Sequence, residues 1–114
     1  MKIERFEDII SWQKSKELCI SIYEVFENCR DFGFKNQIER ASVSIMNNIS
    51  EGFERRTNNE FKQFLFVSKG SCSEVRSMLY LAREIHKISE KDFEQLHSKT
   101  IEISKLLSGL IKTL

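Results

Sequence analysis

Apolar residues recur along the chain at steps of three and four, which is the period of an α-helix. Four segments follow this pattern, at about residues 8–28, 34–55, 58–87 and 90–114. The third segment has one continuous apolar face, formed by Phe61, Phe64, Leu65, Ser68, Cys72, Val75, Leu79 and Ala82. The fourth has the alternating spacing of a heptad seam, at Phe93, Leu96, Thr100, Ile103, Leu107, Leu110 and Leu114.

Two capping boxes predict where the third and fourth helices begin. Thr57 precedes Glu60 by three residues, and Ser89 precedes Asp92 by the same distance. Turn residues between positions 28 and 33 separate the first two helices. Because all connections are short, the pattern predicts an all-α fold, an up-down antiparallel four-helix bundle. Without a linker or repeat in the sequence, residues 1–114 form a single domain in this interpretation.

The second segment is poor in charge, which predicts a central position in the bundle. Polar residues line one of its sides, at Arg40, Ser44, Asn48 and Glu51. Arg40 and Glu51 are three turns apart, about 16 Å, so they need other partners. Ser71 and Glu74 of the third segment are the candidates. We expect a buried polar network that sets the helix register. The alternative is a ligand site within the bundle.

The third segment also carries basic residues in line. Lys62, Lys69, Arg76 and Arg83 are spaced by sevens, and Lys87 extends the line. Steps of seven drift only about 20° around a helix, so these side chains form one ridge. Such a ridge predicts nucleic-acid binding through phosphates, with Tyr80 beside it as a platform for stacking on a base. The alternative is a solvated face paired with Glu17 and Glu24 of the first segment.

Roughly opposite the apolar stripe, the third segment has a second set of large apolar and small residues. It comprises Phe66, Gly70, Ser77, Leu81 and Ile88. Excess apolar surface beside glycine and serine indicates a seam where a helix of another subunit packs. The alternative is that the first or fourth helix of the same chain covers this face. Gly109 in the fourth segment is interpreted as permitting a close helix crossing.

Composition limits the range of functions. The chain has no proline, four glycines and a formal charge of only +1, so no overall charge drives it onto nucleic acid or a membrane. No apolar run approaches the roughly 18 residues of a membrane helix. The amino-terminal residues lack a signal-peptide layout, and three scattered cysteines indicate a reducing, cytoplasmic location. His86 and His97 lie on different helices without a metal-ligand pattern, so we expect no metal, no cofactor and no enzymatic activity.

Several short motifs occur together in an order that resembles one protein family. They are Phe6, Trp12-Gln13, Phe32-Gly33, Gln37, Arg40-Ala41, Ser44-Ile45, Asn48-Ile49, Glu51-Gly52, Gly70-Ser71 and Glu74. This set resembles the small bacterial four-helix-bundle proteins encoded in intervening sequences of 23S ribosomal RNA genes. That family is similar to the accessory protein of diversity-generating retroelements. The resemblance implies a homo-oligomer, a pentamer, with RNA or DNA and a protein such as a reverse transcriptase as partners.

Two functional hypotheses follow from these observations. The first is a non-enzymatic, self-assembling helical bundle that binds RNA, DNA or a nucleic-acid-handling partner through the basic ridge. The second is a protein-interaction scaffold with no role at nucleic acid. Salt-dependent binding to nucleic acid distinguishes between them.

Overall fold

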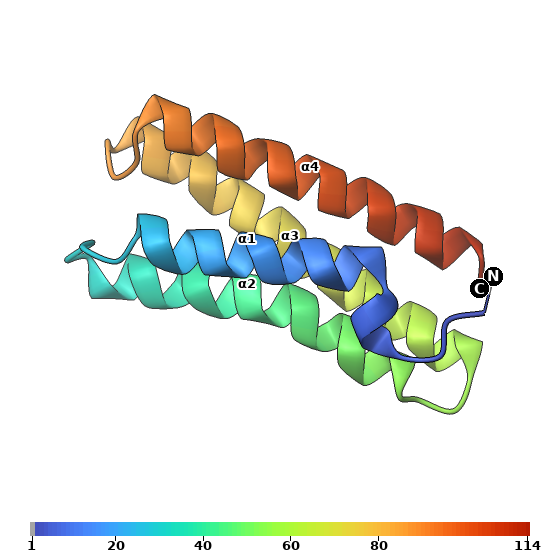
Figure 1. Ribbon diagram of the computed structural model, residues 1–114. Helices are drawn as coiled ribbons and strands as arrows, with labels where there is room; N and C mark the ends of the chain where they lie inside the picture. The colour runs from blue at the N-terminus through green and yellow to red at the C-terminus, as the bar shows by residue number, and fades with distance from the viewer. Residues whose placement is uncertain (1) are drawn as a thin grey trace.

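The computed structural model describes residues 2–114, which form four long helices joined by short connections (Figure 1). A 3₁₀ turn, η1 (Phe6–Asp8), precedes α1 (Ile10–Val25), α2 (Phe32–Phe53), α3 (Asn58–Glu84) and α4 (Glu90–Lys112). Each helix packs against the next in the chain, and α1 also packs against α4, which closes the ring. The fold is therefore the predicted all-α, up-down antiparallel four-helix bundle, with both chain ends at the same end of the bundle.

Thr57 and Ser89 form the predicted N-caps, and they fix the starts of α3 and α4. The Glu60 amide donates to the Thr57 hydroxyl over 3.1 Å, and the Asp92 amide donates to the Ser89 hydroxyl over 3.1 Å. A third cap was not predicted. The Asp31 carboxylate accepts a hydrogen bond from the Phe34 amide over 3.2 Å. As a result, α2 begins at Phe32, two residues before the predicted start.

The end of α3 differs from the prediction, because the helix stops at Glu84 rather than near Lys87. His86 has a φ of 59°, the left-handed conformation that ends many helices. Its amide donates to the Arg83 carbonyl over 3.2 Å, and the Lys87 amide donates to the Ala82 carbonyl over 2.8 Å. These two bonds define a Schellman motif. The chain forms it without the glycine that usually marks the position, so the sequence pattern missed it.

The predicted apolar faces meet in one core. Leu79, Ile45 and Ile103 are fully buried there, with most of the predicted stripe residues, although Phe64 is only half-buried. Two buried polar groups tie α3 to neighbouring helices. The Ser68 hydroxyl donates to the Ile45 carbonyl over 2.7 Å, which ties α3 to α2. The Cys72 thiol donates to the Thr100 carbonyl over 3.3 Å, which ties α3 to α4.

One glycine permits close packing, but it is not the predicted one. A methyl group at Gly109 would meet nothing within 4 Å, so Gly109 does not mark a close crossing and that prediction is wrong. At Gly52 the corresponding carbon would lie 2.5 Å from Cβ of Phe64. The end of α2 therefore approaches the start of α3 so closely that only glycine fits.

Candidate nucleic-acid interface

The basic ridge lies along α3, and all five of its cations are half-buried. One of them, Arg83, makes contacts with another helix of the bundle. The Arg83 guanidinium carbon lies 4.1 Å from the centre of the Phe93 ring, a cation–π contact between α3 and α4. Its Nη1 atom lies 3.8 Å from Oε1 of Glu90. Arg83 therefore contacts the start of α4 through both an aromatic ring and a carboxylate.

Lys87 is the second cation with an internal partner. Its Nζ lies 3.4 Å from Oδ2 of Asp31, the residue that caps α2. The Phe34 amide, which donates a hydrogen bond to this carboxylate, lowers the pKa of Asp31, and Lys87 lowers it further. Because α3 has already ended at Glu84, Lys87 connects two loops at one end of the bundle rather than extending the helical ridge.

Three cations of the ridge remain. Within residues 2–114, Lys62, Lys69 and Arg76 make no ion pair, and no ridge cation pairs with Glu17 or Glu24. The pairing with the first helix is therefore wrong, whereas a solvated face without that pairing is not contradicted. Successive cations are about 10.5 Å apart along the axis, and Lys62 and Arg76 are about 21 Å apart. This row of three cations is the part of the predicted site that remains available for phosphates.

Tyr80 is not a free platform. Its hydroxyl oxygen lies 2.8 Å from Nε2 of His97, and its ring lies 5.5 Å from that of Phe93. His97 in turn stacks on Phe93, with ring centres 5.2 Å apart and planes at 23°. These contacts form an aromatic cluster between α3 and α4. Tyr80 is 43% exposed but held against α4, so a base would have to stack on a fixed, partly covered ring.

The apolar set on the back of α3 is open to solvent in the single chain. Phe66 is 53% exposed and Leu81 is 50% exposed, while Gly70 and Ser77 between them are also exposed. No helix of residues 2–114 covers these four positions, so the alternative of an intramolecular cover is wrong for them. Ile88 differs, because it is half-buried and packs against the core. Two further exposed apolar residues of this surface were missed, Val67 and Ile85.

The predicted polar network forms only in part. The Ser44 and Ser71 hydroxyls share a hydrogen bond of 2.8 Å across the α2–α3 seam. The Asn48 side-chain amide donates to the Ser44 carbonyl over 2.8 Å and to the Ser44 hydroxyl over 3.0 Å. All three residues are half-buried. This small cluster joins α2 to α3 through paired polar groups, and its role in setting the helix register stays a prediction.

The charged members of that network are not buried. Arg40, Glu51 and Glu74 are exposed, so the prediction that they are buried is wrong. Each residue advances by about 100° around a helix, and by this count Arg40 and Glu51 lie further from the buried face of α2 than Ser44 and Asn48 do. Glu74 does gain a partner that was not predicted, since the Gln37 side-chain amide donates to its Oε2 over 3.2 Å.

A groove lies on the outside of the α2–α3 seam, beside the Ser44–Ser71 hydrogen bond. Its volume is about 510 Å³, and its lining is Gly33, Asn36, Gln37, Arg40, Ala41, Ser44, Ser71 and Glu74. The groove is open and polar, and it is not a cavity inside the bundle. Seven of the fourteen motif residues of α2 and α3 line this groove, while Ile45, Ile49 and Gly52 are buried.

The described residues contain few other candidates for chemistry. In residues 2–114 no three side chains of histidine, cysteine, aspartate or glutamate gather closely enough to bind a metal ion. Over the same residues, none of the helices combines the length and apolar character needed to cross a bilayer. Burial raises the pKa of the Cys72 thiol to about 11, although Arg76 nearby lowers it somewhat, so this thiol is not an activated nucleophile.

The fold and its surfaces define a four-helix bundle protein whose basic row, exposed apolar residues and polar groove lie on outer faces of α2 and α3. The chain belongs to the family of 23S rRNA-intervening sequence proteins, whose pattern it matches over residues 7–109. A crystal structure of a protein of unknown function from the S23 ribosomal protein family of Bacteroides thetaiotaomicron is similar in fold. The two sequences are 26% identical, and the two structures superpose with a TM-score of 0.85. The match covers 90% of this chain and 99% of that one. No curated protein matches the sequence.

Proposed function

We propose that this protein is a non-enzymatic, self-assembling helical bundle that binds RNA or DNA through Lys62, Lys69 and Arg76. The observation that carries the proposal is that these three aligned cations have no ion-pair partner within residues 2–114, whereas Arg83 and Lys87 do. Unpaired cations at regular intervals can neutralise phosphates and release their counterions. We place this activity in the cytoplasm, where the free thiols of the chain would stay reduced.

Self-assembly is the second part of the proposal. The open back of α3 presents Phe66 and Leu81 beside Gly70, an arrangement suited to another helix approaching closely. A cyclic homo-oligomer, the pentamer that the family resemblance implies, would repeat the row of cations once per subunit. Repetition raises avidity for a long nucleic acid if the rows share one surface. The same resemblance adds a reverse transcriptase as a protein partner.

The test is a fluorescence-anisotropy titration of a labelled RNA hairpin and a labelled DNA duplex at low salt. Wild type is expected to bind both, with little dependence on sequence. The double variant Lys69→Glu with Arg76→Glu should lose binding. A matched control, Lys91→Glu with Lys105→Glu, applies the same charge change to two exposed lysines of α4 and should retain most of the affinity.

The second candidate function is a protein-interaction scaffold with no role at nucleic acid. The exposed apolar residues of α3 favour it, because they provide an interaction surface without any contribution from the cations. Two results of the titration would support the scaffold against our proposal. They are no binding by wild type at low salt, and equal loss of binding in the α3 and α4 double variants.

A further inference from the structure

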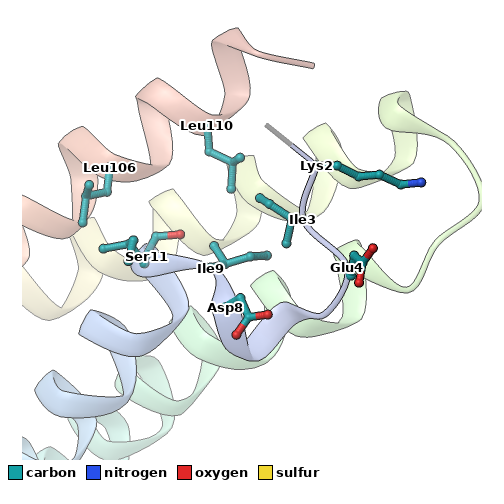
Figure 2. A pocket seen from close by; sticks show the side chains of 9 residues that line it. Lys2, Ile3, Glu4, Asp8, Ile9, Ser11, Leu106 and Leu110 are labelled. Carbon is teal, nitrogen blue, oxygen red and sulfur yellow. The ribbon is translucent and has the colours of Figure 1, made fainter.

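A cavity at the end of the bundle has no role in the proposed function. It lies where the amino-terminal segment passes between the start of α1 and the last turns of α4 (Figure 2). Its volume is about 390 Å³, and it is lined by Lys2, Ile3, Glu4, Asp8, Ile9, Ile10, Ser11, Leu106 and Leu110. This volume falls in the range of about 300–1,000 Å³ that small-molecule sites occupy. Most of the lining is aliphatic, so an apolar chain fits it.

The start of α1 supplies hydrogen-bond donors at this cavity. Ile9 is the N-cap residue, and its side chain cannot cap the helix. The first amide of this helix to bond back along the chain is that of Gln13, which donates to the Ile9 carbonyl over 3.1 Å. The amides of the first turn, from Ile10 to Trp12, therefore lack intrahelical partners.

Ser11 provides an independent sign of a missing partner. The residue is 3% exposed, and its hydroxyl has no hydrogen-bond partner within residues 2–114. In Figure 2 this hydroxyl points toward the space between Ile9 and Leu110. Ser15, one turn further on, is also buried, but its hydroxyl donates to the Ser11 carbonyl over 2.6 Å. Buried hydroxyls are normally paired, so the Ser11 hydroxyl is suited to a bound polar group.

The charges around the cavity select the kind of polar group. Lys2 contributes one positive charge, while Glu4 and Asp8 contribute two negative charges. The end of a helix contributes only about +0.5 of a charge. The surroundings therefore do not favour a carboxylate, and an ammonium, which has no acceptor, could not pair with the amide donors of α1. A primary amide suits them better, because its oxygen can accept from the Ser11 hydroxyl while its N–H groups donate to carboxylates at the rim.

We propose that this cavity binds a small uncharged amphiphile, with an aliphatic chain and a head group that both accepts and donates hydrogen bonds. The head group contacts the Ser11 hydroxyl and the free amides of α1. The aliphatic chain lies against Ile3, Ile9, Ile10, Leu106 and Leu110. This site is separate from the row of cations on α3, so its failure or success does not bear on nucleic-acid binding.

The test uses three probes of equal chain length, hexanamide, hexanoate and hexylamine, with the intact protein. Methyl resonances of isoleucine and leucine report binding, and those of Ile3, Ile10 and Leu110 are expected to shift. Ligands of this size bind with dissociation constants of about a millimolar. Hexanamide should bind tighter than either charged probe. Equal or tighter binding of hexylamine, or no shift with hexanamide, would overturn the proposal.

Two serine variants distinguish specific binding in the cavity from non-specific association of the ligand with apolar surface. Ser11→Ala should weaken hexanamide binding by about tenfold, since it removes the hydrogen bond to the head group. The same variant should raise the thermal midpoint of the ligand-free protein, because it removes an unpaired buried hydroxyl. Ser15→Ala should leave hexanamide affinity unchanged. Equal affinity of wild type and Ser11→Ala would show adventitious binding only.

Discussion

Gly52→Ala tests how closely α2 and α3 pack. The added carbon would lie 2.5 Å from Cβ of Phe64 and 3.0 Å from Cδ1 of Phe61. Carbon atoms in contact normally stay about 3.5–4.0 Å apart, so α3 must move by roughly 1 Å. The Phe64 atom sits next to the backbone, and rotating the side chain does not move it away. The variant therefore strains the junction between two helices.

The change in the free energy of unfolding caused by Gly52→Ala is the balance of two opposing effects. Overpacking of a tight contact costs about 1–3 kcal/mol. Alanine is more favourable than glycine inside a helix by about 0.8–1 kcal/mol. We expect Gly52→Ala to lower the free energy of unfolding by about 1–2 kcal/mol. Gly109→Ala is the matched control, because nothing lies within 4 Å of its added carbon. It should instead stabilise the protein by up to about 1 kcal/mol.

The assay is chemical denaturation followed by circular dichroism at a fixed protein concentration, since assembly makes apparent stability depend on concentration. The two glycine variants should shift the denaturation midpoint in opposite directions. If Gly52→Ala shifts it upward by as much as Gly109→Ala does, α2 and α3 are not in close contact at Gly52, and the packing of this junction is looser than the structure has it.

Three further outcomes follow from the same structure. Leu79→Ala should lower the free energy of unfolding by about 2–5 kcal/mol in denaturation experiments, because Leu79 is fully buried; no loss would contradict that placement. The Cys72 thiol has its pKa raised from 9.0 to about 11, so the native state keeps this proton while the unfolded chain loses it. Stability should therefore fall as the pH rises from 9 to 11, and less so in Cys72→Ala. Leu81→Glu should dissociate the proposed oligomer to a 13.5 kDa monomer in light scattering, with helix content retained; a monomeric wild type would reject assembly.

The starts of α3 and α4 and the core faces were predictable because they depend on local residues. Thr57 and Ser89 cap the helices that follow them with bonds spanning three residues. The core stripe of α3 requires only the helical period. The end of α3 was not predictable in this way, because His86 adopts a left-handed conformation that sequence patterns associate with glycine.

The sequence pattern could not predict which side chains of different helices contact one another. Spacing by sevens predicts that Lys62, Lys69, Arg76 and Arg83 share one side of α3, but it does not reveal that Arg83 contacts Glu90 and Phe93. The glycines are a second example of contacts that the sequence pattern did not predict. Whether a glycine permits close packing depends on what approaches it, and only the assembled bundle brings Phe64 against Gly52. The exposure of Arg40 likewise depends on where α3 lies against α2.

The salt dependence of duplex binding tests the central claim most directly. Each phosphate neutralised contributes about −0.9 to the slope of log affinity against log salt concentration, so one row of three cations predicts about −2.7. Several rows on one duplex would make the slope steeper. Lys69→Gln should reduce the magnitude of the slope, by about 0.9 for each row engaged. Lys87→Gln, which removes a lysine already paired with Asp31, should leave it unchanged. A slope near zero for wild type, or the same slope for both variants, would contradict a nucleic-acid site on α3.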